Sequence, residues 1–246
     1  MLETLIIIAV FATSILSGVL GMAGGMILMA ILVSTLSVGA AMMLHGAVQA
    51  MANGSRSWFL REHIQWRILP GYAAGAALTL VGFISLTLVP DADLILMLVG
   101  ILPFLARLIP HLKGLDVTRV ATAVSCGAVV TAAQLLAGAS GPLLDVFYLN
   151  SPLNRFQIIA SKAFTQALGH LLKLAYYGWI IGVTDSVPVW LYGLAILTAV
   201  AGTRIGTRLL ERVTDTRFRD VSSLVILAIA GVCFLKGAWG IASPWF

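Results

Sequence analysis

Long apolar runs separated by short polar segments are the feature that most constrains this chain. Eight such runs lie at residues 5–36, 38–60, 68–89, 94–109, 117–149, 156–183, 187–205 and 221–241. A helix needs about 20 apolar residues to cross a hydrocarbon core about 30 Å thick. Only 10% of the 246 residues are charged, whereas about a quarter are charged in a soluble domain. We therefore expect an all-α polytopic membrane protein.

Several other classes of protein are excluded. The spans leave no room for a separate soluble domain, and the runs lack the alternation of apolar and polar residues that a transmembrane barrel strand shows. The net charge of +5 comes from loop residues that act as topology signals, so no nucleic-acid partner is expected. Cys126 and Cys233 lie alone in apolar runs, which indicates small core residues and no disulfide, metal or cofactor site.

Two of the runs, at 5–36 and 117–149, are too long for one crossing, since each would form a helix about 48 Å long. Both contain a break rich in small residues. The breaks are Gly21-Met22-Ala23-Gly24-Gly25 and Gly138-Ala139-Ser140-Gly141-Pro142. Glycine pairs and proline favour a chain turn over a continuous helix. Each run is thus either a helical hairpin that enters and leaves on one side or a discontinuous spanning helix.

The distribution of basic residues favours hairpins. If both long runs are hairpins and the other six runs cross fully, 12 of the 15 Lys and Arg fall on one face. These residues lie in the segments 56–67, 107–119, 155 and 204–219. Lys and Arg concentrate in cytoplasmic loops of membrane proteins. We therefore predict a multi-pass protein of the cell inner membrane, with cytoplasmic basic loops and both termini outside.

The chain contains a weak internal repeat. An offset of 117 residues aligns Gly21 with Gly138 and Gly24 with Gly141, and without a gap it pairs Gln49 with Gln166. We predict two units within one membrane domain, 1–113 with hairpin 5–36 and 114–246 with hairpin 117–149, each hairpin followed by three helices. Because three crossings is an odd number, the units are inverted, as in many secondary transporters.

Two stripes of polar residues occupy equivalent positions in these units. The first stripe is His45, Gln49, Asn53 and Arg56, and the second is Lys162, Gln166, His170 and Lys173. Their spacing of four, four and three residues places each stripe on one helix face. Ionisable groups inside a bilayer normally face a bundle interior or an aqueous pathway. The amides alone are also compatible with simple hydrogen bonding between helices.

The glycine-rich breaks supply a second part of the predicted site. A helix that begins at such a break presents free backbone N–H groups and its positive dipole end, which together bind anions. The predicted substrate-binding residues are Gly24, Gly25, His45, Gln49, Asn53, Ser140, Gly141, Lys162, Gln166 and His170. The glycines are alternatively explained by close helix packing.

Coupling to a proton or a sodium ion is the expected source of energy. His45 and His170 have reference pKa values of about 6.5, so either can carry a pH dependence. Asp145 either takes part in proton coupling, pairs with Lys162, or is a first-turn acid favoured by the helix dipole. We interpret Arg56 as snorkelling towards the interface, and Tyr176, Tyr177 and Trp179 as an interfacial cluster.

The first break, Gly21-Met22-Ala23-Gly24-Gly25-Met26-Ile27-Leu28, and the basic loop Ile64-Gln65-Trp66-Arg67 that follows the next helix resemble the sulfite exporter TauE/SafE family of membrane permeases. The resemblance extends over essentially the whole chain. It implies transport of sulfite, sulfonates or other small organosulfur anions. Ala23, Ala30 and His45 depart from the family's usual residues, so the resemblance supports the transport class more firmly than sulfite itself.

The leading hypothesis is a secondary transporter of a small anion that works by alternating access about a midplane site. No P-loop sequence is present, so the energy comes from a gradient. No serine-hydrolase or zinc-protease motif is present either, so an enzyme is not expected. A passive anion channel is the alternative, and the substrate, the transport direction and the oligomeric state are left open.

Overall fold

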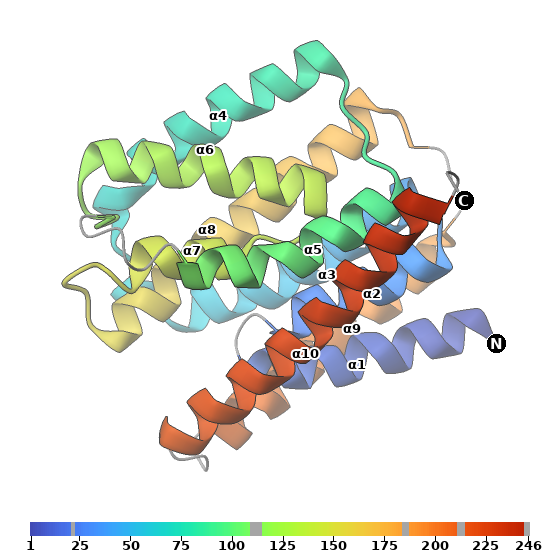
Figure 1. Cartoon of the computed structure of the whole chain (residues 1–246). Coiled ribbons are helices and arrows are strands. Elements are labelled where there is room, and N and C mark those ends of the chain that lie inside the picture. The colour runs from blue at the N-terminus through green and yellow to red at the C-terminus, as the bar shows by residue number, and fades with distance from the viewer. Residues whose placement is uncertain (21–22, 109–114, 184–186, 211–214, 244–246) are drawn as a thin grey trace.

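The computed structural model describes residues 1–20, 23–108, 115–183, 187–210 and 215–243, and in these ranges it is all helical (Figure 1). The first half contains α1 Leu2–Leu20, α2 Ala23–Thr35, α3 Val38–Phe59, α4 Leu69–Leu86 and α5 Ala92–Leu108. The second half contains α6 Val120–Ala137, α7 Gly141–Tyr148, α8 Arg155–Ala175, α9 Val189–Leu210 and α10 Asp215–Ala242. Three short helices, η1 Arg61–His63, η2 Trp66–Ile68 and the π-helix η4 Tyr176–Ile180, complete the described elements.

Capping residues set several helix ends. The hydroxyl of Ser37 accepts from the backbone N–H of Ala40 at the start of α3. Asn154 and Gln157 form a reciprocal capping box at the start of α8. Gly138 ends α6 with a φ of 71°, in the left-handed region that glycine adopts without steric cost. The polar and glycine residues within an apolar sequence therefore decide where its helices begin and end.

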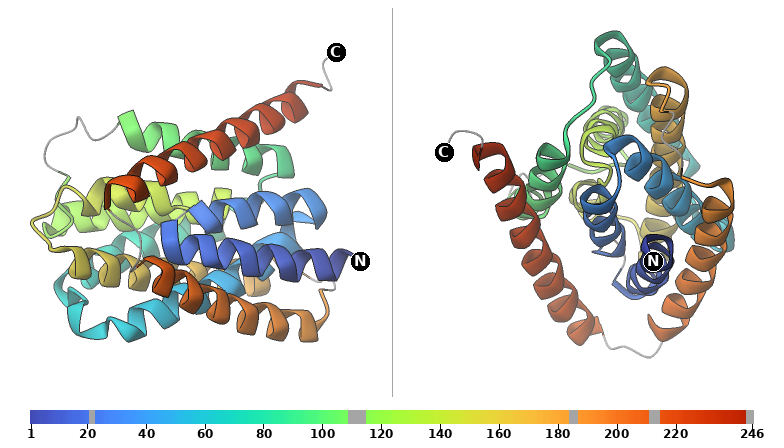
Figure 2. Two further views of the ribbon diagram at one scale, coloured as in Figure 1. Left: turned by 90° about the horizontal axis from the view of Figure 1, so that it is seen from below. Right: turned by 90° about the vertical axis from the view of Figure 1, so that its right-hand side faces the viewer.

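Both long apolar runs fold as helical hairpins. The chain reverses between α1 and α2, and again between α6 and α7, so that each pair runs antiparallel (Figure 2). Gly21 and Met22 of the first break lie outside the described residues. The arms are unequal, because α1 has 19 residues and α2 has 13, whereas α6 has 18 and α7 only 8. At 1.5 Å per residue, the second arms are about 20 Å and about 12 Å long.

The helices of the two halves correspond at the same offset as the sequence. Adding 117 to the bounds of α1 and α3 gives 119–137 and 155–176, close to the bounds of α6 and α8. The members of each of these pairs run in opposite directions (Figure 1). Each first arm packs against a helix of the other half: α1 packs along α9, and its counterpart α6 packs along α4. Two further pairs, α3 with α8 and α5 with α10, each join the two halves.

Glycine allows several of these helices to approach closely. A Cβ atom at Gly75 of α4 would overlap the carbonyl oxygen of Val124, and one at Gly127 of α6 would overlap that of Tyr72. On the other side of the molecule, a Cβ at Gly206 of α9 would overlap the carbonyl oxygen of Ile15. Small residues at such contacts are typical of helix packing in membranes, where van der Waals contact replaces the hydrophobic driving force.

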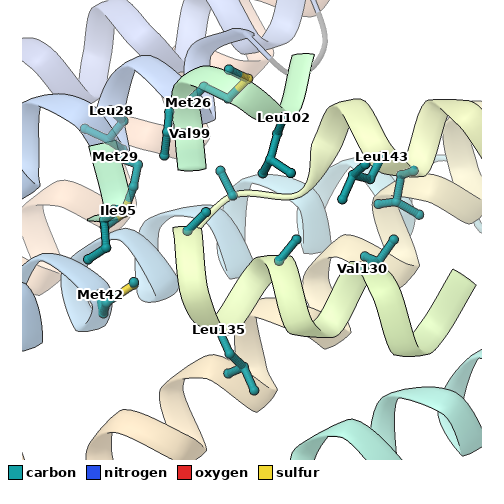
Figure 3. Packing of buried hydrophobic residues seen from close by; sticks show 14 of the residues in the cluster. Met26, Leu28, Met29, Met42, Ile95, Val99, Leu102, Val130, Leu135 and Leu143 are labelled. Atoms are coloured by element: carbon teal, nitrogen blue, oxygen red, sulfur yellow. The ribbon is translucent and has the colours of Figure 1, made fainter. Parts of the chain in front are cut away.

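The apolar core lies where the hairpins meet α5. Figure 3 shows side chains of α2, α5, α6 and α7 in this region, among them Met26, Met29, Ile95, Val99, Leu102, Val130 and Leu143. Cys126 and Cys233 are buried and free, as expected for small core residues. Many large apolar side chains are exposed on the outer helices, such as Leu78, Leu197 and Val232, as a surface that faces lipid requires.

Three helices in the described ranges are long and apolar enough to cross a bilayer: Trp66–Leu86, Val120–Ala137 and Val189–Leu209. Shorter apolar helices lie at Leu2–Gly18, Ala23–Thr35, Ala92–Ala106 and Ile226–Ala242. The chain is thus a helical membrane protein, and the expected six full crossings remain a prediction. Much of the basic segment 204–219, expected to be a loop, is helical, because α9 continues to Leu210 and α10 begins at Asp215.

Candidate functional site

The two hairpins and the two polar stripes meet at one small cavity of about 20 Å³. Its lining comes from α1, the first turn of α2, α3, the start of α7 and α8. The lining residues are Ser17, Gly25, Met26, His45, Gln49, Asn53, Ala139, Ser140, Gly141, Gln166 and His170. Residues separated by more than 140 positions in the sequence therefore share one site.

Eight of the ten residues proposed from the sequence line this cavity, and two do not. Gly24 packs against α1, where a Cβ atom would overlap the carbonyl oxygen of Thr13, so close packing accounts for it. Lys162 forms an ion pair with Asp145 of α7, and their side chains are 16% and 27% exposed. Asp145 thus pairs with Lys162, which is one of the three arrangements that the sequence allows for it.

His45 is held by contacts from both hairpins. Its Nε2 lies 2.8 Å from the carbonyl oxygen of Gly25 in the first turn of α2. Its Nδ1 lies 2.8 Å from Nζ of Lys173, which also donates to the carbonyl oxygen of Gly138 at 3.1 Å. Lys173 is 0% exposed. The last residue of the second stripe is therefore a buried lysine that joins α8 to α3 and to the end of α6.

His170 is held by a residue that the stripes do not contain. The side-chain amide of Gln134 on α6 contacts the His170 ring, and its Oε1 accepts a hydrogen bond from the hydroxyl of Ser140. Gln134 is only 1% exposed. The rings of His170 and His45 lie 5.4 Å apart, centre to centre. Both histidines are thus fixed in orientation beside the same cavity.

The sequence pattern did not single out Ser17 or Gln134, because both lie among apolar and small residues and outside the two polar stripes. The repeat contained a signal for them, since the offset of 117 residues pairs Ser17 with Gln134. Both are buried. Each lies near the end of the first arm of its hairpin, so the repeat places a polar residue at the same point in both units.

Neutral amides contribute much of the polar lining. The side chain of Gln49 lies beside Gly25, where a Cβ atom would be 3.2 Å from Nε2 of Gln49. Asn53 Nδ2 donates to the backbone oxygen of Gln49 at 3.0 Å. Gln166, the counterpart of Gln49, lines the cavity from α8. Such amides supply donors without the desolvation cost of a second buried charge.

The start of each second arm also reaches the cavity. Gly25 and Met26 belong to the first turn of α2, while Ser140 and Gly141 stand at the start of α7. Backbone N–H groups in a first turn have no partner within the helix, and the dipole places positive potential there. Pro142 has no N–H group, so α7 offers fewer backbone donors than α2.

Two interpretations of interfacial residues are corrected by the structure. Arg56 does not snorkel, because its guanidinium donates to the carbonyl oxygen of Ser17 at 3.0 Å. Tyr176 and Tyr177 are 0% exposed, and their hydroxyls donate to carbonyl oxygens of Leu88 and Leu135. Only Trp179 of that cluster, at 85% exposed, faces outward. Arg56, Tyr176 and Tyr177 therefore each bind a backbone carbonyl inside the protein.

The arrangement suits an anion better than a cation. Among the described residues no carboxylate lines the cavity, whereas amides, imidazoles and residues at the start of α2 and α7 do, and Lys173 contacts His45 from behind. A volume of about 20 Å³ holds roughly one water molecule. A larger anion therefore needs a wider cavity than this structure shows.

Comparison with known families gives a match over most of the chain. The family model described as sulfite exporter TauE/SafE matches residues 5–232. The matched range includes both glycine-rich breaks, both polar stripes and every residue that lines the cavity. Comparisons with curated proteins and with solved structures gave no match.

Proposed function

Because the chain belongs to the sulfite exporter TauE/SafE family of membrane transporters, we propose that it is a secondary transporter of a small anion. The proposed substrate class is sulfite, a sulfonate or another organosulfur anion. The observation that carries the proposal is the cavity, to which both hairpins and both polar stripes contribute. Half-helix ends that meet at a central site are typical of secondary transporters.

The oxygen atoms of a sulfur oxyanion fit the donors of this cavity. Gln49 and Gln166 would donate from opposite sides, and the first turn of α2 would donate backbone N–H groups. His45 and His170, and their hydrogen-bonded neighbours, would set the charge beside the substrate. Asn53, Ser140 and Gly141 complete the proposed binding set. Lys162 lies outside the cavity lining, where it forms an ion pair with Asp145.

Alternating access would follow from two inverted repeats. This is supported by the common offset of the helix bounds and by the opposite directions of counterpart helices (Figure 1). Since α1 packs on α9 and α6 on α4, the bodies that move would combine helices from both repeats. The proposed setting is the cell inner membrane with cytoplasmic basic loops, and a proton or a sodium ion would drive transport.

The test is uptake of ³⁵S-sulfite into liposomes that contain the purified protein. A transporter gives saturable uptake and counterflow when the liposomes are preloaded with unlabelled sulfite. A passive channel gives current that follows the electrochemical gradient and no counterflow, and that result would overturn the proposal. Thiosulfate, sulfoacetate, taurine and simple carboxylates as competitors would define the substrate class.

Binding variants connect the activity to the cavity. We expect Gln49→Leu and Gln166→Leu each to weaken sulfite binding about 10- to 100-fold, because each removes a hydrogen bond to a charged group. Gln65→Leu, in the loop between η1 and η2, is the matched control and should bind as the parent does. Unchanged binding in both cavity variants would remove the amides from the site.

A further inference from the structure

We propose that Lys173 is a positioning residue that holds the first turn of α2 and the end of α6 together, and that one proton added to the Lys173–His45 pair releases them. This inference rests on the proposed transport function for its purpose, although its test does not require transport. It assigns a structural role to a lysine that does not itself line the cavity.

Three hydrogen bonds form a continuous chain between the two hairpins. Gly138, the residue that ends α6, accepts from Lys173 at 3.1 Å. Lys173 contacts Nδ1 of His45 at 2.8 Å, and Nε2 of His45 contacts the Gly25 carbonyl at 2.8 Å. The chain thus runs from the turn of the second hairpin to the first turn of α2. It crosses between α8 and α3, the helices that carry the polar stripes.

The directions of these bonds fix the tautomer of His45. A carbonyl oxygen only accepts, so Nε2 must carry a hydrogen and donate to Gly25. An ammonium group only donates, so Nδ1 must accept from Lys173. With Lys173 protonated, His45 is therefore neutral and carries its proton on Nε2. If the shared proton moves from Lys173 to Nδ1, the imidazolium donates in the other direction and the chain persists with the same single charge.

A second proton breaks the chain. With both groups protonated, Nδ1–H and the ammonium N–H groups face each other with no acceptor between them, and two like charges lie within hydrogen-bond distance. The titratable group that faces the pair within the described residues is His170, also on α8. The described part of α2 carries no titratable side chain. Tyr176 and Tyr177 of η4 donate their hydroxyl groups to backbone carbonyls. Asp145 of α7 is paired with Lys162.

Release of this chain would let the first turn of α2 and the end of α6 move apart where the cavity has to widen. The same proton would add a positive charge beside the space that the anion enters. Proton and anion would then favour each other's binding, which is the reciprocal coupling that a symporter of these two ions requires. Deprotonation would rebuild the chain and close the cavity around a neutral His45.

A cysteine at position 139 reports on opening without any need for transport. Ala139 lines the cavity and is 5% exposed. In the full chain with Cys126→Ala and Cys233→Ala, Ala139→Cys is the only thiol. Its rate of reaction with a negatively charged methanethiosulfonate reagent is measured at pH 8 and pH 5.5, alone and combined with Lys173→Met or His45→Gln. Comparison at equal pH removes the effect of thiol ionisation.

Lys173→Met removes the chain, so we expect this protein to react about 10-fold faster than the parent at pH 8. His45→Gln preserves the chain, because its Oε1 accepts from Lys173 and its Nε2 donates to Gly25, but it does not titrate. At pH 5.5 the parent should become as reactive as Lys173→Met, while His45→Gln stays about 10-fold slower. The comparison of parent with His45→Gln remains decisive if Lys173→Met fails to fold.

Two results would overturn the inference: equal rates for the parent and a folded Lys173→Met at pH 8, or a parent that matches His45→Gln at both pH values. Failure of the transport proposal would be seen separately, as an absence of sulfite counterflow in liposomes while the cysteine still reports opening at low pH.

Discussion

At the scale of single residues, the buried polar groups around the cavity find partners that are distant in the sequence. The side chain of Gln134 on α6 accepts a hydrogen bond from Ser140, which precedes α7, and also contacts the ring of His170 on α8. Removing such a residue leaves two buried polar groups without a partner, and each lost partner costs more than an average hydrogen bond contributes. Gln134 is therefore expected to matter for stability as well as for the site.

We predict that Gln134→Leu lowers the free energy of unfolding by about 1–3 kcal/mol. The measurement is chemical denaturation of the purified protein in detergent. Ser14→Ala is the matched control, since the Ser14 hydroxyl is equally buried but has no hydrogen-bond partner among the described residues. The control should be neutral or slightly stabilising, and an equal loss in both variants would contradict the argument.

Lys162 gives a second prediction at this scale. Lys162→Met leaves the partly buried carboxylate of Asp145 without its partner, so we expect a loss of about 1–3 kcal/mol in the free energy of unfolding. Adding Asp145→Leu should recover more than half of this loss, because no unpaired charge then remains. Lys236→Met, at an exposed position of α10, should change stability by no more than about 0.5 kcal/mol. A double variant less stable than Lys162→Met would refute the pairing argument.

The sequence predicted the cavity residues well where they form a periodic pattern. His45, Gln49, Asn53, Gln166 and His170 all line the cavity, because polar residues at helical spacing in an apolar run have to face away from lipid. The partner of each residue was less predictable. The spacing does not show that Lys173 reaches His45 or that Arg56 reaches Ser17, since these contacts depend on how α3, α8 and the hairpins pack.

At the scale of secondary-structure elements, the hairpins depend on close contact between their arms. The first turn of α2 lies directly against α1, where Gly24 faces Thr13 and Ser17. This contact holds the start of α2 in place, and with it Gly25 and Met26 at the cavity. A side chain at position 24 would therefore affect both hairpin stability and the site.

We predict that Gly24→Ala destabilises the protein by about 1–3 kcal/mol, the usual cost of overpacking. Gly54→Ala in α3 is the matched control, because nothing lies within 4 Å of a Cβ atom there. In a helix interior this control should gain roughly 0.5–1 kcal/mol. Thermal unfolding of both variants checks the prediction, and a stabilised Gly24→Ala would show that the arms do not pack this closely.

Most helices were predictable to within a few residues, since apolar runs bounded by caps and glycines determine them. The glycine-rich breaks predicted the chain reversals, but not the unequal arms. The second arm of the second hairpin ends at Tyr148, and the capping box of Asn154 and Gln157 then starts α8. The early start of α10 at Asp215 was missed because its first residues are polar, and helix propensity without an apolar pattern is a weak signal.

At the scale of the whole molecule, the two halves are interlocked. The sequence shows the repeat as an offset of 117 residues, but it does not show which helices of the two halves pack together. Which distant helices pack together depends on glycine contacts, such as Gly206 with Ile15 and Gly127 with Tyr72. These contacts join residues from different halves, so neither half has a complete set of packing partners by itself.

The last prediction concerns the orientation of the whole molecule in its membrane. The start of α1 and the end of α10 lie at the same end of the molecule, opposite the loop that contains η1 (Figure 2). Because the basic residues concentrate at the η1 end, that end should be cytoplasmic.

We therefore expect a single cysteine at Glu3 or Ser243, in a Cys126→Ala/Cys233→Ala background, to react with a membrane-impermeant maleimide applied outside intact inner-membrane vesicles of native orientation. A cysteine at Glu62 should react only after the vesicles are permeabilised. Labelling of positions 3 and 62 from the same side would contradict the arrangement, and labelling of position 62 alone would reverse the orientation while leaving the fold intact.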